Sequence, residues 1–539
     1  MFTKILIANR GVAAVRIART LQRMGITSIA LRTKAEKDGR YFEFFDEVYD
    51  LVGNSVAETY LDVAQILAIA DQAKADAIHP GYGFLSENAD FASKVAAAGL
   101  AFLGPSPEVI NVFGLKHEAR ALAQTEGVPI LEGTSILPDL AAAVSAAKEV
   151  GFPLLLKSTA GGGGIGMQRC DSVKDLEAAF ESVTALAKSN FTSPGVFLEK
   201  CITNARHVEV QLFGDGEGEV IILGDRDCSL QRRNQKLVEE CPAPNLPENI
   251  RQSMHNRARS LAASVNYASA GTIEFLYDAD AQEYYFLEVN TRLQVEHGVT
   301  ELVYGVDIVE WMIRLAAKDL PSCRALEAEL KPSGAAVQVR LYAEDPYDNY
   351  KPTPGEVDVN YPDVGRIDSW VGQRSLVSHW FDPLLANIMS FGESRSQAID
   401  GLLATLAETK IYGTTTNISL LQQALDCNLF RAGNIDTKLL AALSYQPNEL
   451  EVIRPGLEMT VQSYPGRQGY WDVGVPPSGP MDDLSFQLGN RLLDNPLGAA
   501  GLEMVLAGAK IRFRGSTRCV LTGARLQATL DEQPIKRGQ

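Results

Sequence analysis

Apolar runs alternate with amphipathic stretches at the start of the chain, and this pattern predicts a parallel sheet. Residues 4–8 form an apolar strand, and an Ala/Val/Ile pattern with helical spacing follows it to about residue 23. Apolar strands recur at 29–32 and 75–79. Strands that alternate with helices favour parallel pairing through crossover connections. We therefore expect a first α/β domain at 1–112.

The next block has longer strands and one predicted hairpin. The expected strands are 206–213, 219–224, 271–277 and 284–290. The last two flank a short polar loop, so a hairpin there would set Glu274 nearly opposite Glu288. We assign this block to a second domain at 113–330.

Two further segments follow. The expected elements of a third domain at 331–445 are a strand at 335–342 and helices at 394–407 and 418–426. Residues 446–456 are rich in turn formers and predict a linker. Residues 457–539 hold many Gly and Pro residues between short strands, which indicates a different, β-rich segment. The fold class is therefore mixed, α/β and α+β.

Composition narrows the function classes. The 539 residues are 46% hydrophobic and 22% charged, with a net charge of −17. This acidic balance argues against nucleic acid or an anionic membrane as the main partner. No apolar run is long enough to span a membrane, and the first residues predict a strand instead of a signal peptide. Seven dispersed cysteines without C-x-x-C spacing indicate reduced thiols in a cytoplasmic protein.

The decapeptide 288–297, Glu-Val-Asn-Thr-Arg-Leu-Gln-Val-Glu-His, carries the strongest chemical signal. Polar residues occupy every second position, which predicts one face of a strand that runs into a loop. These residues are Glu288, Asn290, Arg292, Gln294 and Glu296. Such a face can hold a divalent cation, an anion and a general base together. The alternative is a solvated edge strand.

Within this face, Glu274, Glu288 and Asn290 offer the oxygen ligands that Mg²⁺ prefers. The alternative is a pair of strand carboxylates bound to arginine. Glu296 stands where the strand should end, and it could act as base for a substrate held by Arg292 and Lys236. His297 would point to the other side of an extended chain, so we expect a structural role for it.

A glycine-rich tract follows the apolar strand that ends near Lys157. Four consecutive glycines can expose backbone N–H groups to phosphate oxygens. The lysine precedes the glycines, which excludes a P-loop and favours a flap over a nucleotide, with Lys157 as a point charge on phosphate. Lys116 is a second candidate phosphate ligand. The alternatives are a plain flexible loop and a surface lysine.

The run Asp227–Glu240 is dense in polar residues. One interpretation is a solvated loop, and the other places Lys236 against an anion. Cys228 has no identifiable base beside it, so we expect a buried, unreactive thiol.

Taken together, these residues resemble the biotin carboxylase component of the biotin-dependent carboxylases, an ATP-grasp family, over about 1–445. The motifs that carry the resemblance are Ile7–Gly11, His79–Asn88, Lys157 with its glycine flap, Arg206–Glu209, Arg226–Gln231, Glu288–His297, and Arg340 before Ala343–Pro346. The resemblance implies an N-terminal α/β domain, an ATP-grasp domain with a mobile lid, and a C-terminal α+β domain.

The resemblance also implies a role for each matching residue. ATP would be bound by Lys116, Lys157, Gly163, Gly164, His207, Gln231 and Asn234, with Glu199, Lys200, Cys201 and Ile202 as the adenine hinge. Glu274, Glu288 and Asn290 would hold Mg²⁺ or Mn²⁺. Lys236, Arg292, Gln294 and Val295 would hold bicarbonate. Glu296 would deprotonate bicarbonate, and Arg340 would bind biotin and stabilise its enolate.

Three departures, Asn234, Ile165 and Gly298, resemble the urea carboxylase branch, including its guanidine-using relatives. Residues 461–474 and 477–482 resemble the start of an allophanate hydrolase subunit 2-like carboxyltransferase domain. No Met-Lys-Met biotinylation site is present, so the resemblance implies a biotin carrier and a complete carboxyltransferase elsewhere as partners. A homo-oligomer is compatible with it.

The sequence and the resemblance thus predict ATP- and bicarbonate-dependent carboxylation of biotin via carboxyphosphate, as the N-terminal part of a urea carboxylase. The alternatives are the same half-reaction serving guanidine, an acyl-CoA or pyruvate, and a non-catalytic regulatory subunit that retains the fold.

Overall fold

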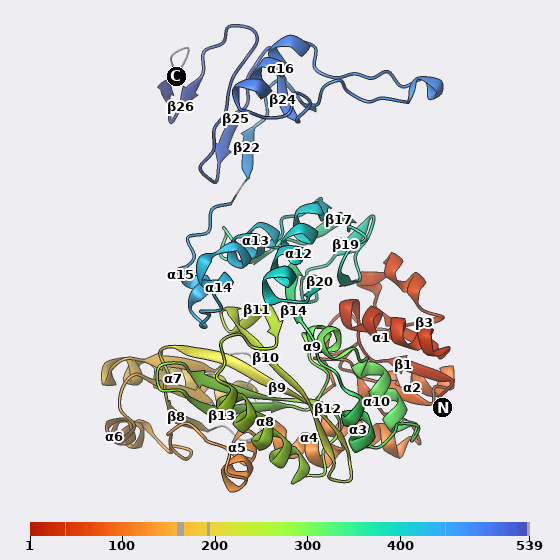
Figure 1. Ribbon diagram of the computed structural model, residues 1–539, viewed down its shortest axis with the longest axis vertical. Coiled ribbons are helices and arrows are strands. Elements are labelled where there is room, and N and C mark those ends of the chain that lie inside the picture. The colour runs from red at the N-terminus through yellow and green to blue at the C-terminus, as the bar shows by residue number, and fades with distance from the viewer. Residues whose placement is uncertain (38, 159–165, 191–194, 448, 536–539) are drawn as a thin grey trace. The chain divides into compact units, whose positions relative to one another are not determined.

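The chain divides into two units, Met1–Ser444 and Tyr445–Gln539, which we describe separately (Figure 1). The structure, a computed structural model, describes residues 1–37, 39–158, 166–190, 195–447 and 449–535. Among these residues, no helix is both long and apolar enough to cross a membrane.

Five parallel strands form the first sheet, in the order β3-β2-β1-β4-β5. Its elements are β1 Lys4–Ile7, α1 Gly11–Met24, β2 Thr27–Arg32, β3 Glu47–Asp50, α2 Val63–Ala73, β4 Ala77–His79, α3 Ala89–Ala97 and β5 Ala101–Phe102, with α4 Pro107–Gly114 after it. The strands bury Leu6, Ile29 and Ile78 in one core, because parallel strands are covered on both faces. The predicted parallel α/β start of the chain is confirmed.

An antiparallel sheet of eight strands forms the centre of the first unit, in the order β13-β12-β9-β10-β11-β14-β20-β18. Its strands are β9 Ala205–Asp215, β10 Val220–Arg232, β11 Gln235–Cys241, β12 Ala268–Asp278, β13 Glu283–Asn290, β14 Ala335–Tyr342, β18 Arg366–Ser369 and β20 Leu384–Gly392. The β12–β13 hairpin pairs Glu274 with Glu288, as the sequence predicts. The sheet therefore carries candidate metal ligands in one half and Arg340, on β14, in the other.

The polar run from Asp227 to Glu240 is not a solvated loop. Strand β10 continues beyond the predicted end at residue 224 to Arg232, and β11 pairs with it. Arg233 and Asn234 form the turn, with φ of 49° and 65°, which suits an asparagine in the left-handed region. Three acidic side chains of this run are buried, and each pairs with an arginine from another part of the chain: Asp227 with Arg206, Glu239 with Arg340, and Glu240 with Arg395.

A separate three-stranded sheet, in the order β7-β6-β8, carries Lys157. Its elements are β6 Leu154–Ser158, β7 Met167–Cys170 and β8 Val196–Lys200, with the helices α6 Leu140–Val150 and α7 Val173–Asn190. The glycine tract joins β6 to β7, and Gly163, Gly164 and Ile165 lie outside the described residues.

The first unit also has further helices and short strands, and these strands form two small sheets, β15-β16 and β19-β17-β21, separate from the large one. The helices are α5 Lys116–Thr125, α8 Glu248–Ala263, α9 His297–Tyr304, α10 Ile308–Ala316, α11 Cys323–Glu329, α12 Arg395–Glu408, α13 Ile418–Asp426, α14 Asn428–Arg431 and α15 Leu439–Ala442. The short strands are β15 Glu344–Asp345, β16 Lys351–Pro352, β17 Gly355–Asn360, β19 Ser375–Val377 and β21 Lys410–Tyr412.

In its described residues, the second unit consists of short paired strands, one α-helix of ten residues and a short 3-10 helix at Trp471–Val473. Its elements are β22 Leu450–Arg454, β23 Glu458–Gln462, α16 Asp483–Leu492, β24 Gly501–Val505, β25 Lys510–Phe513, β26 Thr529–Leu530 and β27 Gln533–Pro534. Strand β22 pairs with β25, so part of the predicted linker 446–456 is a strand. Among the described residues from 457 onward, only Gly489 and Asn490 are buried.

Candidate active site

Lys236, on β11, lies at the centre of a cluster of buried carboxylates. Its ammonium nitrogen lies 2.6 Å from Glu209 Oε2, 2.8 Å from Glu274 Oε1 and 2.8 Å from Glu296 Oε1. Burial alone would favour a neutral lysine, but the three carboxylates raise the pKa of Lys236 well above its usual value. Lys236 is therefore a fixed positive charge in contact with Glu296.

Glu296 is the N-cap of α9 and is fully buried. Its other carboxylate oxygen accepts a hydrogen bond from Arg340 Nη2 at 3.0 Å. Burial opposes the charge of Glu296, but Lys236, Arg340 and Arg226 outweigh it and hold its pKa below the usual range. A substrate that draws these cations toward its own oxygens would therefore raise the proton affinity of Glu296.

The predicted single strand face from 288 to 296 is wrong beyond Asn290, where β13 ends. The chain turns instead, because Glu87 binds the backbone N–H of Thr291 and the guanidinium of Arg292, at 3.2 and 3.0 Å. Arg292 also donates to Asn290 Oδ1 and Gln294 Oε1, at 2.9 and 3.0 Å. The polar residues still converge, but through a turn held by side chains.

Two neighbours complete this turn. The backbone carbonyl of Val295 accepts a hydrogen bond from Asn387 at 3.3 Å. His297 is buried, and its ring Nδ1 lies 2.7 Å from the carbonyl oxygen of Gln294. This contact with the backbone is in keeping with the structural role expected for His297.

The three predicted metal ligands lie side by side. Glu274 accepts hydrogen bonds from Asn290 and Gln294, at 2.8 and 3.2 Å, in addition to Lys236. Glu288 is its ladder partner, and burial together with the charge of Glu274 raises the pKa of Glu288. Two adjacent buried carboxylates oppose each other's ionisation, and a divalent cation would relieve that repulsion. The donor set fits Mg²⁺ or Mn²⁺.

The predicted nucleotide-binding residues lie on several elements, of which α5, β6 and β8 carry the two lysines and the start of the hinge. Lys157 pairs with the carboxylate of Glu199, which also accepts from Arg120 at 2.6 Å. Lys116 begins α5, and burial together with the charge of Lys157 lowers its pKa against the pull of Glu288. The remaining hinge residues, Lys200, Cys201 and Ile202, stand at the end of β8.

His207 links this region to Glu274. Its ring Nε2 lies 2.7 Å from Glu274 Oε2, and its Nδ1 lies 2.9 Å from Gln231 Nε2. Burial disfavours the charged ring, but Glu274 outweighs burial and raises the pKa of His207. Asn234 stands apart from these contacts, in the β10–β11 turn.

The structure adds residues that the sequence analysis did not single out. Glu209 contacts Lys236 and, at 2.5 Å, the buried Arg226. Alternation along β9 puts it on the same side as His207, so the period-2 pattern could have found it. Glu239, which binds Arg340, could not be found in this way. The β10–β11 register shifts near Leu237, so alternation does not carry from Lys236 to Glu239.

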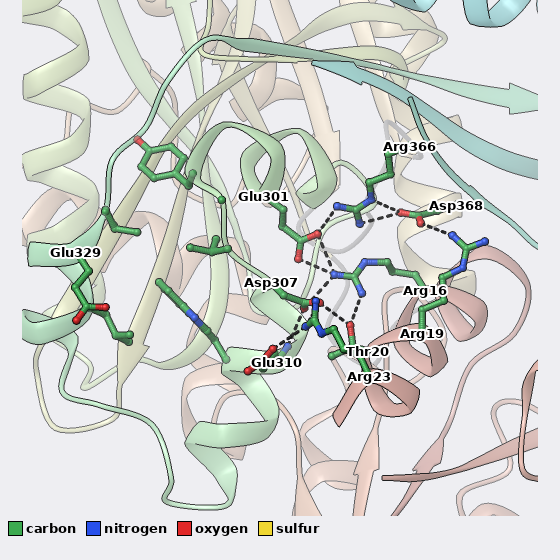
Figure 2. Close-up of a pocket in the computed structure, with 16 residues that line it drawn as sticks. Arg16, Arg19, Thr20, Arg23, Glu301, Asp307, Glu310, Glu329, Arg366 and Asp368 are labelled. Carbon is green, nitrogen blue, oxygen red and sulfur yellow. Dashed lines mark hydrogen bonds and ion pairs between the residues drawn. The ribbon is translucent and has the colours of Figure 1, made fainter. Parts of the chain in front are cut away.

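Helix α9, which begins beside the candidate base, is anchored through Glu301. Arg16 donates to both oxygens of Glu301 at 2.8 and 2.9 Å, and Arg366 donates at 2.7 Å. Figure 2 shows both guanidinium groups pointing toward Glu301, in a pocket of about 660 Å³ that contains none of the predicted site residues. At Gly298, an added Cβ would lie 2.4 Å from Met389 Sδ. The start of the helix is therefore held by close packing and its body by ion pairs.

Lysines and paired carboxylates set around the buried Glu296 suit a ligase of the ATP-grasp type. The family matches agree with it. They are "Biotin carboxylase, N-terminal domain" over residues 1–110, "Carbamoyl-phosphate synthase L chain, ATP binding domain" over 116–321, and "Biotin carboxylase C-terminal domain" over 338–442. A fourth, "Carboxyltransferase domain, subdomain A and B", covers 473–539.

Individual proteins that are similar to this chain point to the same family as the family matches. Biotin carboxylase 2 of Bacillus subtilis is 42% identical over 82% of this chain and 99% of its own length. The urea amidolyase of Saccharomyces cerevisiae is 48% identical over 99% of this chain but only 29% of its own length. The chain belongs to the biotin carboxylase family, and the expected fold is confirmed.

Solved structures extend the comparison. The urea carboxylase of Kluyveromyces lactis aligns with all of this chain and 41% of its own, with a TM-score of 0.79 and 40% identity. The biotin carboxylase domain dimer of Hydrogenobacter thermophilus 2-oxoglutarate carboxylase, in complex with MgADP, ADP and bicarbonate, aligns with 82% of this chain and 97% of its own. Its TM-score is 0.78, with 37% identity.

Proposed function

We propose that this chain carboxylates biotin with ATP and bicarbonate, as part of a urea carboxylase. The observation that carries the proposal is the convergence of Lys236 and Arg340 on the buried Glu296. Two cations and one carboxylate in contact can hold an anion and remove a proton from it.

In this proposal, Lys236, Arg292, Gln294 and the backbone of Val295 bind bicarbonate. As Lys236 and Arg340 turn to the substrates, Glu296 loses its stabilising partners and becomes a stronger base. It then takes the proton of bicarbonate, which is a poor nucleophile until deprotonated. The deprotonated oxygen attacks the γ-phosphorus of ATP, and ADP leaves as carboxyphosphate forms. The carboxyl group passes from carboxyphosphate to biotin, and the phosphate that is released takes the proton of biotin. Arg340 next supports the negative charge of the biotin enolate.

We assign the nucleotide to Lys116, Lys157, His207 and Gln231, with the hinge at 199–202 around adenine. Asn234 and the glycines 163 and 164 remain part of this proposal. Glu274, Glu288 and Asn290 would hold Mg²⁺ or Mn²⁺, which offsets charge on the phosphates when bound. Lys236 already pairs with Glu274, so a bound metal ion would share that carboxylate with the lysine.

The acceptor is urea in this proposal, supported by the urea amidolyase and urea carboxylase relatives that match the whole chain. Guanidine, an acyl-CoA and pyruvate are the competing acceptors. Biotin would be presented by a carrier domain, and a complete carboxyltransferase domain would be the second partner.

The domain limits 1–112, 113–330, 331–445 and 457–539 are retained as part of the proposal. A cytoplasmic location is supported by the seven free cysteines, and a homodimer by the dimeric relative.

The test is phosphate release with ATP, Mg²⁺ and free biotin, measured with and without bicarbonate. We expect bicarbonate to stimulate the release. A folded, ATP-binding sample without such stimulation would exclude the activity and leave the regulatory alternative. Adding a biotinylated carrier and carboxyltransferase fragment, with urea, guanidine, acetyl-CoA and pyruvate in parallel, then identifies the acceptor.

A further inference from the structure

Two adjacent glutamates on β11 are both buried but have different partners. Glu239 is fully buried, and its Oε1 accepts from Arg340 Nε at 2.5 Å. Glu240 is 2% exposed and pairs with Arg395, which is not among the candidate site residues. The proposed reaction assigns no role to the carboxylate of Glu239 or of Glu240.

Arg340 is held from two sides. Its Nε donates to Glu239, and its Nη2 donates to Glu296 at 3.0 Å. An arginine between two carboxylates has its planar group fixed in both position and tilt, because each carboxylate restrains a different nitrogen. We propose that Glu239 is a positioning residue that aims the guanidinium of Arg340 at Glu296 and at the biotin it is proposed to bind. This inference rests on the proposed function.

Gln338, the ladder partner of Glu239 on β14, provides a second observation. Its Nε2 donates to Glu239 Oε2 at 3.1 Å. Its Oε1 is buried and has no hydrogen-bond partner among the described residues. An amide can turn to present either end, so Gln338 can serve a charged Glu239 as donor and a protonated one as acceptor.

The charges around Glu239 favour gain and loss of its carboxyl proton near neutral pH. Burial and the charge of Glu296 raise the pKa of Glu239 to about 7, while Arg340 and Lys236 oppose them. From the other elements packed on β11, the thiol of Cys228 and the phenol of Tyr342 also face it, and burial holds both pKa values high, so neither titrates in this range. Glu239 is thus the member of this group that changes charge near pH 7.

The charge of Glu239 determines the direction in which pH should change turnover. When Glu239 is protonated, Arg340 is drawn more fully to Glu296 and weakens it as a base. When Glu239 ionises, it takes a larger share of Arg340 and also repels the charge of Glu296, so the proton affinity of Glu296 rises. Turnover should therefore increase as pH rises through 7.

The experiment compares Glu239→Gln with Glu240→Gln across pH 6 to 8. The two variants remove a carboxylate of the same kind and burial from the same strand, and Glu240 also has a pKa raised to about 7, by burial and Asp227 against Arg395. The measured quantity is the variant-to-wild-type ratio of bicarbonate-dependent turnover, which cancels the pH dependence of bicarbonate itself.

For Glu239→Gln we expect turnover to fall about 10- to 100-fold, the scale of a small misplacement of a catalytic group. The variant-to-wild-type ratio of turnover should fall further as pH rises. The KM for ATP should stay within about twofold of the wild-type value, because the residues assigned to the nucleotide are unchanged. For Glu240→Gln the ratio should stay near one at every pH. If Glu239→Gln yields little folded protein, Glu239→Asp, which withdraws the carboxylate by one methylene, should show the same loss of turnover at an unchanged KM for ATP.

Equal ratios for the two glutamine variants, or a Glu239 variant with normal turnover, would overturn the positioning role alone. A wild-type protein that binds ATP without bicarbonate-stimulated hydrolysis would overturn the proposed function and this inference with it.

Discussion

The two units of the chain use their apolar residues in opposite ways. In Met1–Ser444, apolar side chains such as Leu212 and Phe275 are fully buried in continuous cores. In Tyr445–Gln539, Trp471 is 70% exposed and Met481 is 88% exposed, and no aliphatic or aromatic side chain larger than proline is buried in its described part. Local pairing of β23 with β24 thus exists in the second unit without a core beneath it.

The difference in burial between the two units shows that a strand or helix pattern in the sequence does not by itself tell whether the apolar side chains of that segment are buried. The first unit closes its sheets with helices, and this rigidity permits charges such as Lys236 and Glu296 to be held away from water. The second unit keeps its polar groups near water, and its described part cannot shield a charge cluster in this way. Catalysis should therefore depend on the first unit alone.

The strongest test of this division is loss of the candidate base. Glu296→Gln should reduce bicarbonate-dependent turnover about 10²- to 10⁴-fold, because a general base acting on bicarbonate is removed. ATP affinity should stay nearly unchanged. Glu458→Gln, an exposed glutamate of the second unit, is the matched control and should turn over like wild type. A Glu296 variant within about threefold of wild type would place the base elsewhere.

A matched pair of leucine truncations tests the difference in burial. Leu212→Ala should destabilise the first unit by about 2–5 kcal/mol, because it opens a cavity in a filled core. Leu484→Ala, at a site 75% exposed on α16, should change stability by less than about 0.5 kcal/mol. Chemical denaturation followed by circular dichroism measures both. Similar losses at the two sites would show that the second unit has a core after all.

Removal of a candidate metal ligand should have a smaller effect on turnover. Glu288→Gln should raise the Mg²⁺ concentration for half-maximal turnover at least about tenfold, because one of two carboxylate ligands is lost. Glu283→Gln, an exposed residue at the start of the same strand, is the control. A metal titration identical to wild type would reject Glu288 as a ligand.

The smallest effect is expected from removal of the second unit. Limited trypsin digestion should cut first after exposed sites such as Arg454 and Arg467, since segments with few buried contacts open most easily. Biotin carboxylation by the digested sample should stay within about twofold of the intact chain. Digestion of both units at one rate, or loss of activity with the first cut, would contradict the division.

The sequence predicted much of the fold because its signals are local. Apolar alternation located β14 to the residue, and the short polar loop was enough to pair Glu274 with Glu288. It failed where distant residues decide the geometry. The side chain of Glu87 bends the chain after Asn290, so a strand face was expected where a turn exists.

Prediction of the candidate site from the sequence was also limited by contacts between distant parts of the chain. Lys236 and Glu296 were recognised from a dense polar pattern and from a family resemblance. Glu209, the partner of Lys236, was missed although alternation along β9 could have found it, and Glu239, the partner of Arg340, was missed because its contact is set by sheet register. A one-residue shift near Leu237 changes which side chains share a face, and no composition or spacing reveals it.

The anchoring of Glu301 has a consequence for how the protein is made. Its partners Arg16 and Arg366 are 350 positions apart in the chain, so the ribosome must release both before α9 can take its final place. Contacts this distant in sequence form late, since a long loop must close first. Glu296, at the start of α9, is therefore among the last parts of the first unit to be set, and a nascent chain that ends before Arg366 should lack the proposed bicarbonate binding.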